Sequence, residues 1–82
     1  MLSDHSEELR ALIRRVVEES RLSQHQLARD AGMSYAALHA WIIGKRTPRP
    51  ESLLQLADGL ESRADVLHHL VEELRRAAGS AE

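Results

Sequence analysis

Cysteine and phenylalanine are both absent from this chain of 82 residues. Without cysteine, the chain can form neither a disulfide bond nor a zinc site with thiolate ligands. Its apolar runs are short, and none approaches the roughly 20 residues that a membrane-spanning helix needs. The amino-terminal segment MLSDHSEELR is acidic and lacks the apolar stretch of a signal peptide. We therefore expect a cytoplasmic protein that does not associate with membranes.

Residues arranged for catalysis or for cofactor binding are also missing. There is no glycine-rich phosphate loop, and the scattered carboxylates are not accompanied by a recognisable set of nucleophile, base and orienting residue. Among the five histidines, His68 and His69 are adjacent and would diverge on a helix, which is not a spacing typical of a metal site. The sequence predicts no enzyme activity, no cofactor and no metal.

The length is suited to one domain over residues 1–82 with one modest core. Apolar residues repeat at helical spacing without strand-like alternation, so the sequence predicts an all-α fold. Five helices are expected, each opened by a capping or first-turn residue: Asp4, Ser23, Ser34, Pro50 and Ser62. Glycines at positions 44 and 79 are expected to end the third and fifth helices, the fifth covering residues 62–78.

The segment from Gln24 to Lys45 has the pattern of two short helices that cross over one shared core. The apolar positions that fit this arrangement are Leu27, Ala31, Met33, Leu38 and Trp41. Gly32 lies between the two helices, where a glycine adopts a positive φ without a Cβ clash. We expect Trp41 to be buried in this core rather than exposed as a stacking or ligand-binding aromatic.

These residues resemble the helix-turn-helix of the lambda-repressor and Cro-like (XRE) family, over roughly residues 6–61. The resemblance rests on Gln24, Leu27-Ala28, Ala31-Gly32-Met33, Leu38 and Trp41, and on the GKRTP run that starts at Gly44. The chain's size and its last helix are similar to small phage Cro-type repressors and to restriction-modification controller proteins. The resemblance implies a five-helix lambda-repressor-like domain whose second and third helices bind double-stranded DNA, the third in the major groove.

The resemblance places the base-contacting positions on one face of the third helix: Tyr35, Ala36, His39 and Ala40, with Ala37 on the opposite flank. A phenol, an imidazole and methyl groups suit hydrogen bonds to base edges and contacts with thymine methyls. Because no Arg, Asn or Gln stands at these positions, we expect DNA shape and water-mediated contacts to contribute to specificity. The alternatives are a capping or packing role for Tyr35 and a solvated side chain for His39.

Charge is unevenly distributed along the chain, although the net charge is only −2. Residues 21–50 contain five basic residues and one acidic residue, a net charge of +4, whereas the flanking segments together carry −6. A basic middle suits a surface that meets phosphates, and acidic flanks keep other faces away from DNA. The expected phosphate contacts are Gln24, Lys45, Arg46 and Arg49.

A broad apolar stripe in the expected fifth helix predicts a homodimer. The predicted interface residues are Val66, Leu67, Leu70, Val71 and Leu74. A two-fold axis would place two recognition helices about 34 Å apart and require a roughly palindromic operator. The alternative is that this helix completes the core of its own chain.

The sequence therefore favours a dimeric, sequence-specific transcriptional regulator that binds a DNA operator. Repression is the expected sign of regulation, because no segment resembles an activation or ligand-sensing domain. Two other functions remain open. The chain could be the antitoxin of a toxin-antitoxin pair, with a toxin as its protein partner, or a helical protein-interaction module that does not bind DNA.

Overall fold

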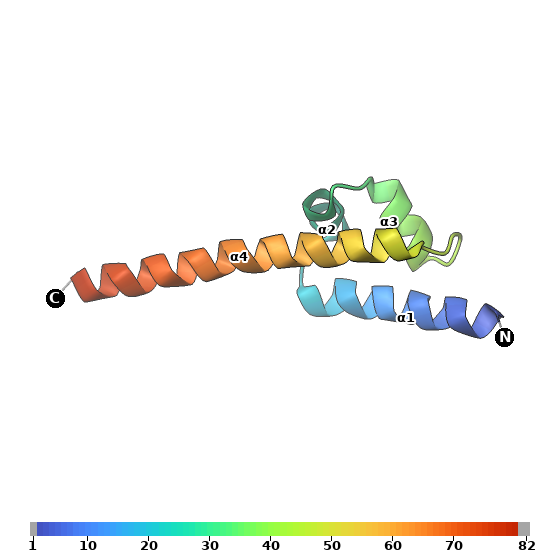
Figure 1. Ribbon diagram of the computed structural model, residues 1–82, viewed down its shortest axis with the longest axis horizontal. Coiled ribbons are helices and arrows are strands. Elements are labelled where there is room, and N and C mark those ends of the chain that lie inside the picture. The colour runs from blue at the N-terminus through green and yellow to red at the C-terminus, as the bar shows by residue number, and fades with distance from the viewer. Residues whose placement is uncertain (1, 81–82) are drawn as a thin grey trace.

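The structure is a computed structural model that describes residues 2–80, with side chains from residue 6 onward. Its elements are α1 (Leu2–Ser20), α2 (Gln24–Ala31), α3 (Tyr35–Ile42) and α4 (Pro50–Ser80), and no strand occurs within this range. The molecule measures 61 × 22 × 19 Å, and α1, α2 and α3 gather around the first half of the long helix α4 (Figure 1). The predicted all-α class is confirmed.

The predicted count of five helices is wrong, because the expected fourth and fifth helices form one continuous helix of 31 residues. Ser62 and Asp65 are good helix caps, but both residues are also compatible with a helix interior. Gly59 costs about 1 kcal/mol relative to alanine there, which does not break a helix that packs against other elements. Gly79 also lies inside α4 rather than after its end.

The first helix begins at Leu2, before the expected start at Asp4. Asp4 therefore lies within the helix, and its predicted capping interaction falls outside the residues whose side chains the structure describes. The helix ends at Ser20, after which Arg21 adopts a left-handed φ of 61°. Ser20 Oγ accepts a hydrogen bond from the backbone N–H of Leu22 at 3.3 Å, which helps to fix this exit from the helix.

The caps of the two short helices are confirmed. Ser23 Oγ accepts a hydrogen bond from the backbone N–H of Gln26 at 3.0 Å, and Ser34 Oγ accepts one from Ala37 at 3.1 Å. Between the helices, Gly32 has a φ of 69° and its N–H donates to the carbonyl of Arg29. Only glycine takes this conformation without steric cost, so the chain reverses at the position that the sequence predicts.

The core lies where α2 and α3 cross between α1 and α4. Its buried residues are Ile13, Leu27, Ala28, Ala31, Leu38, Trp41 and Leu56. Trp41 is 7% exposed, so its predicted place in the core is confirmed. Since α2 and α3 supply five of these seven residues, the orientation of the two short helices is determined by the same apolar contacts that stabilise the domain.

A close approach of backbones joins α2 to α4. Gly59 is buried, and a Cβ atom built on it would lie 2.7 Å from Ala31 Cα. Beside this contact, the Gln55 side-chain amide donates hydrogen bonds to the carbonyls of Ala31 and Gly32, at 2.8 and 3.1 Å. The carboxyl-terminal end of α2 is therefore held against α4 by a close backbone contact at Gly59 and by two hydrogen bonds from Gln55.

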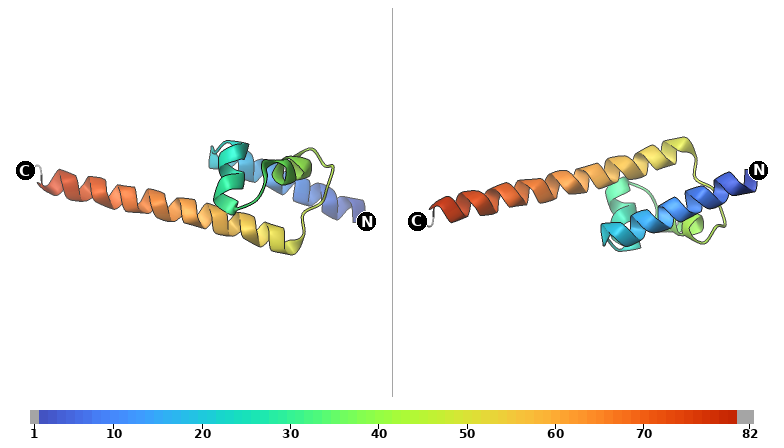
Figure 2. Two further views of the ribbon diagram at one scale, coloured as in Figure 1. Left: turned by 90° about the horizontal axis from the view of Figure 1, so that it is seen from above. Right: turned by 90° about the horizontal axis from the view of Figure 1, so that it is seen from below.

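The second half of α4 projects away from the other helices, as both views of Figure 2 show. Every residue from Ala64 to Ser80 is exposed. The alternative that this segment completes the core of its own chain is therefore wrong. Within the described residues, no helix has the length and apolar character required to cross a lipid bilayer.

The Gly59 contact yields a matched pair of variants in one helix. Gly59→Ala should lower the free energy of unfolding, because the new methyl group would meet the Ala31 backbone at 2.7 Å, outweighing the gain of about 1 kcal/mol in helix propensity. Gly79→Ala should be neutral or stabilising, since nothing lies within 4 Å of its added Cβ. Urea unfolding of both variants tests this expectation, and a stabilised Gly59→Ala protein would contradict the close approach.

Candidate nucleic-acid interface

The predicted base-contacting residues lie on α3, whose opposite face is anchored in the core by Leu38 and Trp41. Ala36 is exposed and Tyr35 is 38% exposed, while His39 and Ala40 are half-buried. Ala37 is also half-buried and packs partly against the core. The amino-terminal end of α3 is therefore its most accessible part, and Ala37 lies on a more enclosed flank.

Tyr35 is held in a row of nearly parallel rings. Its ring lies 4.0 Å from that of His25 with an angle of 9° between their planes, and 5.4 Å from that of His39 with an angle of 15°. The predicted packing role of Tyr35 is thus present, although more than a third of the residue remains exposed. His25 belongs to α2, so this row joins the first turns of the two short helices.

Gln24 and His39 are directly linked. His39 Nδ1 lies 3.3 Å from Gln24 Oε1, within hydrogen-bonding distance. Because an amide oxygen can only accept, the imidazole donates its Nδ1 proton in this arrangement, and the other ring nitrogen of neutral His39 is an acceptor. The same bond leaves the side-chain NH₂ group of Gln24 as a donor. With this tautomer of His39, the pair keeps one acceptor and one donor that this hydrogen bond does not use.

Two arginines of α1 hold the carboxyl-terminal end of α3. Arg10 Nε and Arg14 Nε each donate to the carbonyl oxygen of Ile42 at 3.2 Å. The last carbonyls of a helix have no partner within the helix and carry partial negative charge, so cations are favourable there. This contact could not be predicted from the sequence, since Arg10 and Arg14 precede Ile42 by 32 and 28 residues.

The basic turn after α3 is folded back on the helix. The backbone N–H groups of Lys45 and Arg46 both donate to the carbonyl of Ala40, at 2.8 and 3.2 Å, and Gly44 permits this turn with a φ of 80°. Lys45, Arg46 and Arg49 are all exposed. The backbone of the turn is thus fixed while its cationic side chains reach solvent.

Arg46 and Arg49 line one hollow of about 560 Å³ beside α3. The other residues around it are Ala37, Trp41, Thr47, Pro48 and Ser52. Two guanidinium groups next to hydroxyl groups form a surface that can take up an anionic oxygen. This hollow places two of the predicted phosphate contacts beside Ala37, whereas Lys45 is not among its lining residues.

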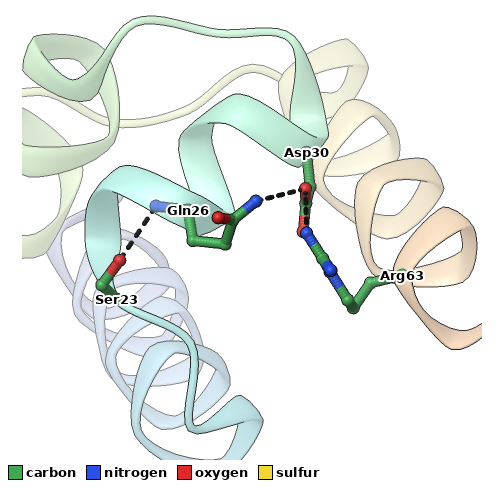
Figure 3. A network of polar contacts seen from close by, with 4 residues as sticks. All are labelled: Ser23, Gln26, Asp30 and Arg63. Atoms are coloured by element: carbon green, nitrogen blue, oxygen red, sulfur yellow. Dashed lines mark hydrogen bonds and ion pairs between the residues drawn. The ribbon is translucent and has the colours of Figure 1, made fainter. Parts of the chain in front are cut away.

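An ion pair positions α2 on α4, as Figure 3 shows. Arg63 makes two hydrogen bonds to the carboxylate of Asp30, at 2.8 and 2.9 Å, and Gln26 Nε2 donates a third at 2.8 Å. The Arg63 guanidinium therefore holds the pKa of Asp30 below its usual value, with a further contribution from the Gln26 amide. Asp30 is the one acid of residues 21–50, and its hydrogen-bonded ion pair is with Arg63 of α4 rather than with a basic residue of that segment.

Some predicted site residues come together and others do not. The structure joins Gln24 with His39 through a hydrogen bond and Tyr35 with His39 through ring stacking. Arg46 and Arg49 share the hollow beside α3. The predicted interface residues of α4 are exposed on the projecting half of the helix, apart from these groups (Figure 1). His25 was not among the predicted site residues, and its signal in the sequence is an aromatic ring at the second position of α2.

Comparison with known proteins gives one family. A model described as helix-turn-helix matches residues 13–67, which include α2, α3 and the first part of α4. No curated protein and no solved structure matches the chain. The matched range contains all nine predicted base and phosphate contacts, and it ends at Leu67, four residues after Arg63, which contacts α2.

The Asp30 ion pair predicts a pH dependence of stability. A carboxylate whose pKa is lowered in the folded state stabilises the fold above its unfolded pKa, and this contribution is lost as the pH falls through and below about 4. Asp30→Asn should therefore be less stable than the parent protein near neutral pH, and the difference should shrink as Asp30 protonates. Urea unfolding of both proteins at several pH values from about 7 down to about 2.5 measures this difference in the free energy of unfolding. A difference that does not change with pH would contradict the ion pair.

Proposed function

Since this chain belongs to the XRE-type helix-turn-helix family, we propose that it is a transcriptional regulator that binds a specific sequence of double-stranded DNA. We further propose that it is a cytoplasmic, dimeric repressor that acts at a palindromic operator. The observation that carries the proposal is the accessible amino-terminal end of α3, which contacts the first turn of α2 through the stacking of His25 on Tyr35, together with the exposed basic turn that follows α3.

The phosphate contacts are assigned to two places, the first turn of α2 and the basic turn after α3. Gln24 donates its NH₂ group to one phosphate, together with backbone N–H groups in the first turn of α2, where no acidic residue opposes an anion. Lys45, Arg46 and Arg49 contact the backbone from the turn after α3. These contacts position the protein on the duplex and give affinity without sequence preference.

The base contacts are assigned to α3. The acceptor nitrogen of neutral His39 suits the amino group of adenine or cytosine in the major groove. The Tyr35 hydroxyl can donate or accept, and its ring is already ordered by stacking. Ala36, Ala37 and Ala40 offer methyl groups, which suit contacts with thymine. Few strong base contacts arise from these side chains, so DNA shape also contributes to recognition.

Repression follows from occupancy. A dimer bound across two half-sites covers the DNA between them, and this excludes other proteins from the same segment without any catalytic step. Two copies of α3 must then be about one helical turn of DNA apart, which requires two-fold symmetry in both protein and operator.

A second function is favoured by one observation, the apolar surface on the projecting half of α4. Leu67 is 54% exposed and Leu74 is 70% exposed, and such residues suit a protein partner. In an antitoxin, this surface would hold a toxin while α3 still bound DNA, and a second small protein would copurify.

A protein-interaction module without DNA binding would give a different result: no sequence would be enriched when bound duplexes are selected from a random pool.

The basic turn determines the salt dependence of binding. Lys45→Ala and Arg46→Ala should each weaken binding to every duplex sequence and flatten the plot of log affinity against log salt by about 0.9 for each phosphate that the variant no longer neutralises. Arg76→Ala removes one positive charge from the projecting end of α4 and should change that slope little. Fluorescence anisotropy over a salt series measures the three variants. Equal slopes for all of them would contradict the assignment.

The role of His39 is tested through sequence preference. In selection from a random duplex pool, His39→Ala should lose the preference at one position in each half-site while the rest of the motif persists, because one hydrogen bond to one base is removed. Lys45→Ala should keep the whole motif and bind it more weakly. If His39→Ala selects the same motif as the parent protein, His39 does not contact a base.

A further inference from the structure

Leucine recurs every seven residues along α4, and a small apolar residue follows each leucine by four. The leucines are Leu53, Leu60, Leu67 and Leu74, and the small residues are Ala57, Ala64, Val71 and Ala78. Apolar residues that alternate at spacings of four and three are the pattern of a two-stranded coiled coil, with the small residues at position a and leucine at position d. One helix alone cannot bury such a stripe.

The domain itself covers only the beginning of this stripe. Leu53 and Leu60 are half-buried against the core, whereas Val71 is 40% and Leu74 is 70% exposed. Where the stripe meets the domain, it opens into an apolar groove of about 210 Å³ between α1 and α4. The groove is lined by Leu12, Ile13, Val16, Leu53, Leu56, Ala57 and Leu60. The groove and the projecting stripe therefore form one continuous apolar surface.

Charges beside the stripe distinguish the two possible orientations of a second α4 helix. The e positions, each directly after a leucine of the stripe, are Leu54, Glu61, His68 and Arg75. In a parallel pair, an e residue faces a g residue of the other helix, so that Glu61 would face Leu56 and Arg75 would face Leu70. In an antiparallel pair, e residues face each other, so that Glu61 can face Arg75 at both ends of the pair. Only the antiparallel arrangement brings these opposite charges together.

We infer that a second copy of this chain covers the stripe, with the two α4 helices forming an antiparallel coiled coil centred near His69. Leu67 then packs against Val71 of the second copy, Ala64 against its Leu74, and Leu60 against its Ala78. Both symmetry-related pairs of Glu61 and Arg75 form. The end of each α4 helix reaches Leu60 of the other copy, which lines the apolar groove. The inference specifies the dimer that the proposed function requires.

The charges also select the register. Moving one helix by seven residues toward the groove of the other copy would place Glu61 opposite His68 and Arg75 opposite Leu54, and would break both ion pairs. Within the described residues, neither Glu61 nor Arg75 takes part in an ion pair of its own chain, and both are exposed. Each is therefore available to a second copy in the register centred near His69.

Charge exchange tests the orientation in the full-length protein without DNA. Glu61→Arg and Arg75→Glu should each weaken the dimer about tenfold, because two attractive pairs become repulsive. An equimolar mixture of the two variants should recover parental affinity as a heterodimer, in which both pairs again have opposite charges. Sedimentation equilibrium measures the dissociation constants. Single variants that dimerise like the parent protein, or a mixture that recovers nothing, would overturn the antiparallel pairing.

Single cysteines give a second test, since the natural chain contains none. A mixture of Ala64→Cys and Leu74→Cys proteins should form a mixed disulfide on mild oxidation, whereas Ala64→Cys alone should not form a disulfide with itself. A disulfide between two copies of Ala64→Cys would show a parallel dimer. A mixed disulfide of Ala64→Cys with Leu67→Cys, but not with Leu74→Cys, would show the shifted register.

A matched pair of neighbours tests whether this stripe is the surface that associates. Leu67 and Val66 are similarly exposed, at 54% and 49%, and the sequence predicts both in the interface. In the inferred coiled coil, however, Leu67 is at position d and Val66 is at position c, outside the contact stripe. Leu67→Ser should weaken the dimer at least about tenfold, and Val66→Ser should leave it nearly unchanged. Circular dichroism reports whether each monomer remains helical. A parent protein that is monomeric at high concentration, or that binds only an unrelated protein through Leu67, would overturn the inference.

These experiments can fail independently of the proposed function. Dimerisation is measured without DNA, while the Lys45 and His39 variants measure DNA binding on a different part of the molecule. A monomer that still selects a DNA motif would disprove the coiled coil and leave sequence-specific DNA binding in place. A dimer that selects no motif would disprove sequence-specific DNA binding and leave the coiled coil in place.

Discussion

Close packing of α2 on α4 is the constraint on which the rest of the structure depends. Ala31 and Gly59 meet without intervening side chains, and the Asp30–Arg63 ion pair fixes the same two helices beside this contact. Because a turn of only three residues, Gly32 to Ser34, joins α2 to α3, the position of α2 also determines which face of α3 reaches solvent. The same contact sets the direction in which α4 leaves the domain. The contact between α2 and α4 therefore determines how the proposed DNA-reading surface is oriented relative to the proposed dimer surface.

The proposed reading surface is ordered before any DNA is present. His25 stacks on Tyr35, and Gln24 hydrogen-bonds to His39, so the first turn of α2 holds two side chains of α3 in place. Ordering side chains on binding costs free energy, and contacts that already exist reduce this cost. A first turn that also donates to phosphate would couple the position of the DNA backbone to the orientation of the base-contacting groups.

Features that depend on neighbouring residues were predictable from the sequence. Ser23 and Ser34 cap their helices, Gly32 reverses the chain and Pro50 begins α4, because each effect acts within one turn of backbone. The continuity of α4 was not predictable in this way. Ser62 and Asp65 are compatible with both a cap and a helix interior, and long-range contacts at Gly59 and Arg63 favour the continuous helix.

In the candidate site, too, features set by neighbouring residues were predictable. The helical spacing correctly placed Leu38 and Trp41 in the core and Tyr35 on the exposed surface of α3. The assigned DNA contacts remain predictions. The sequence could not reveal the contacts of His25 or of Arg10, which join residues of different helices.

The most direct test of DNA binding through α2, α3 and the basic turn is a map of backbone amide chemical shifts by NMR as a selected duplex is added. Changes should concentrate in the first turns of α2 and α3 and in residues 44–49. Changes confined to α1 or to the projecting half of α4, or no changes at low salt, would contradict the account.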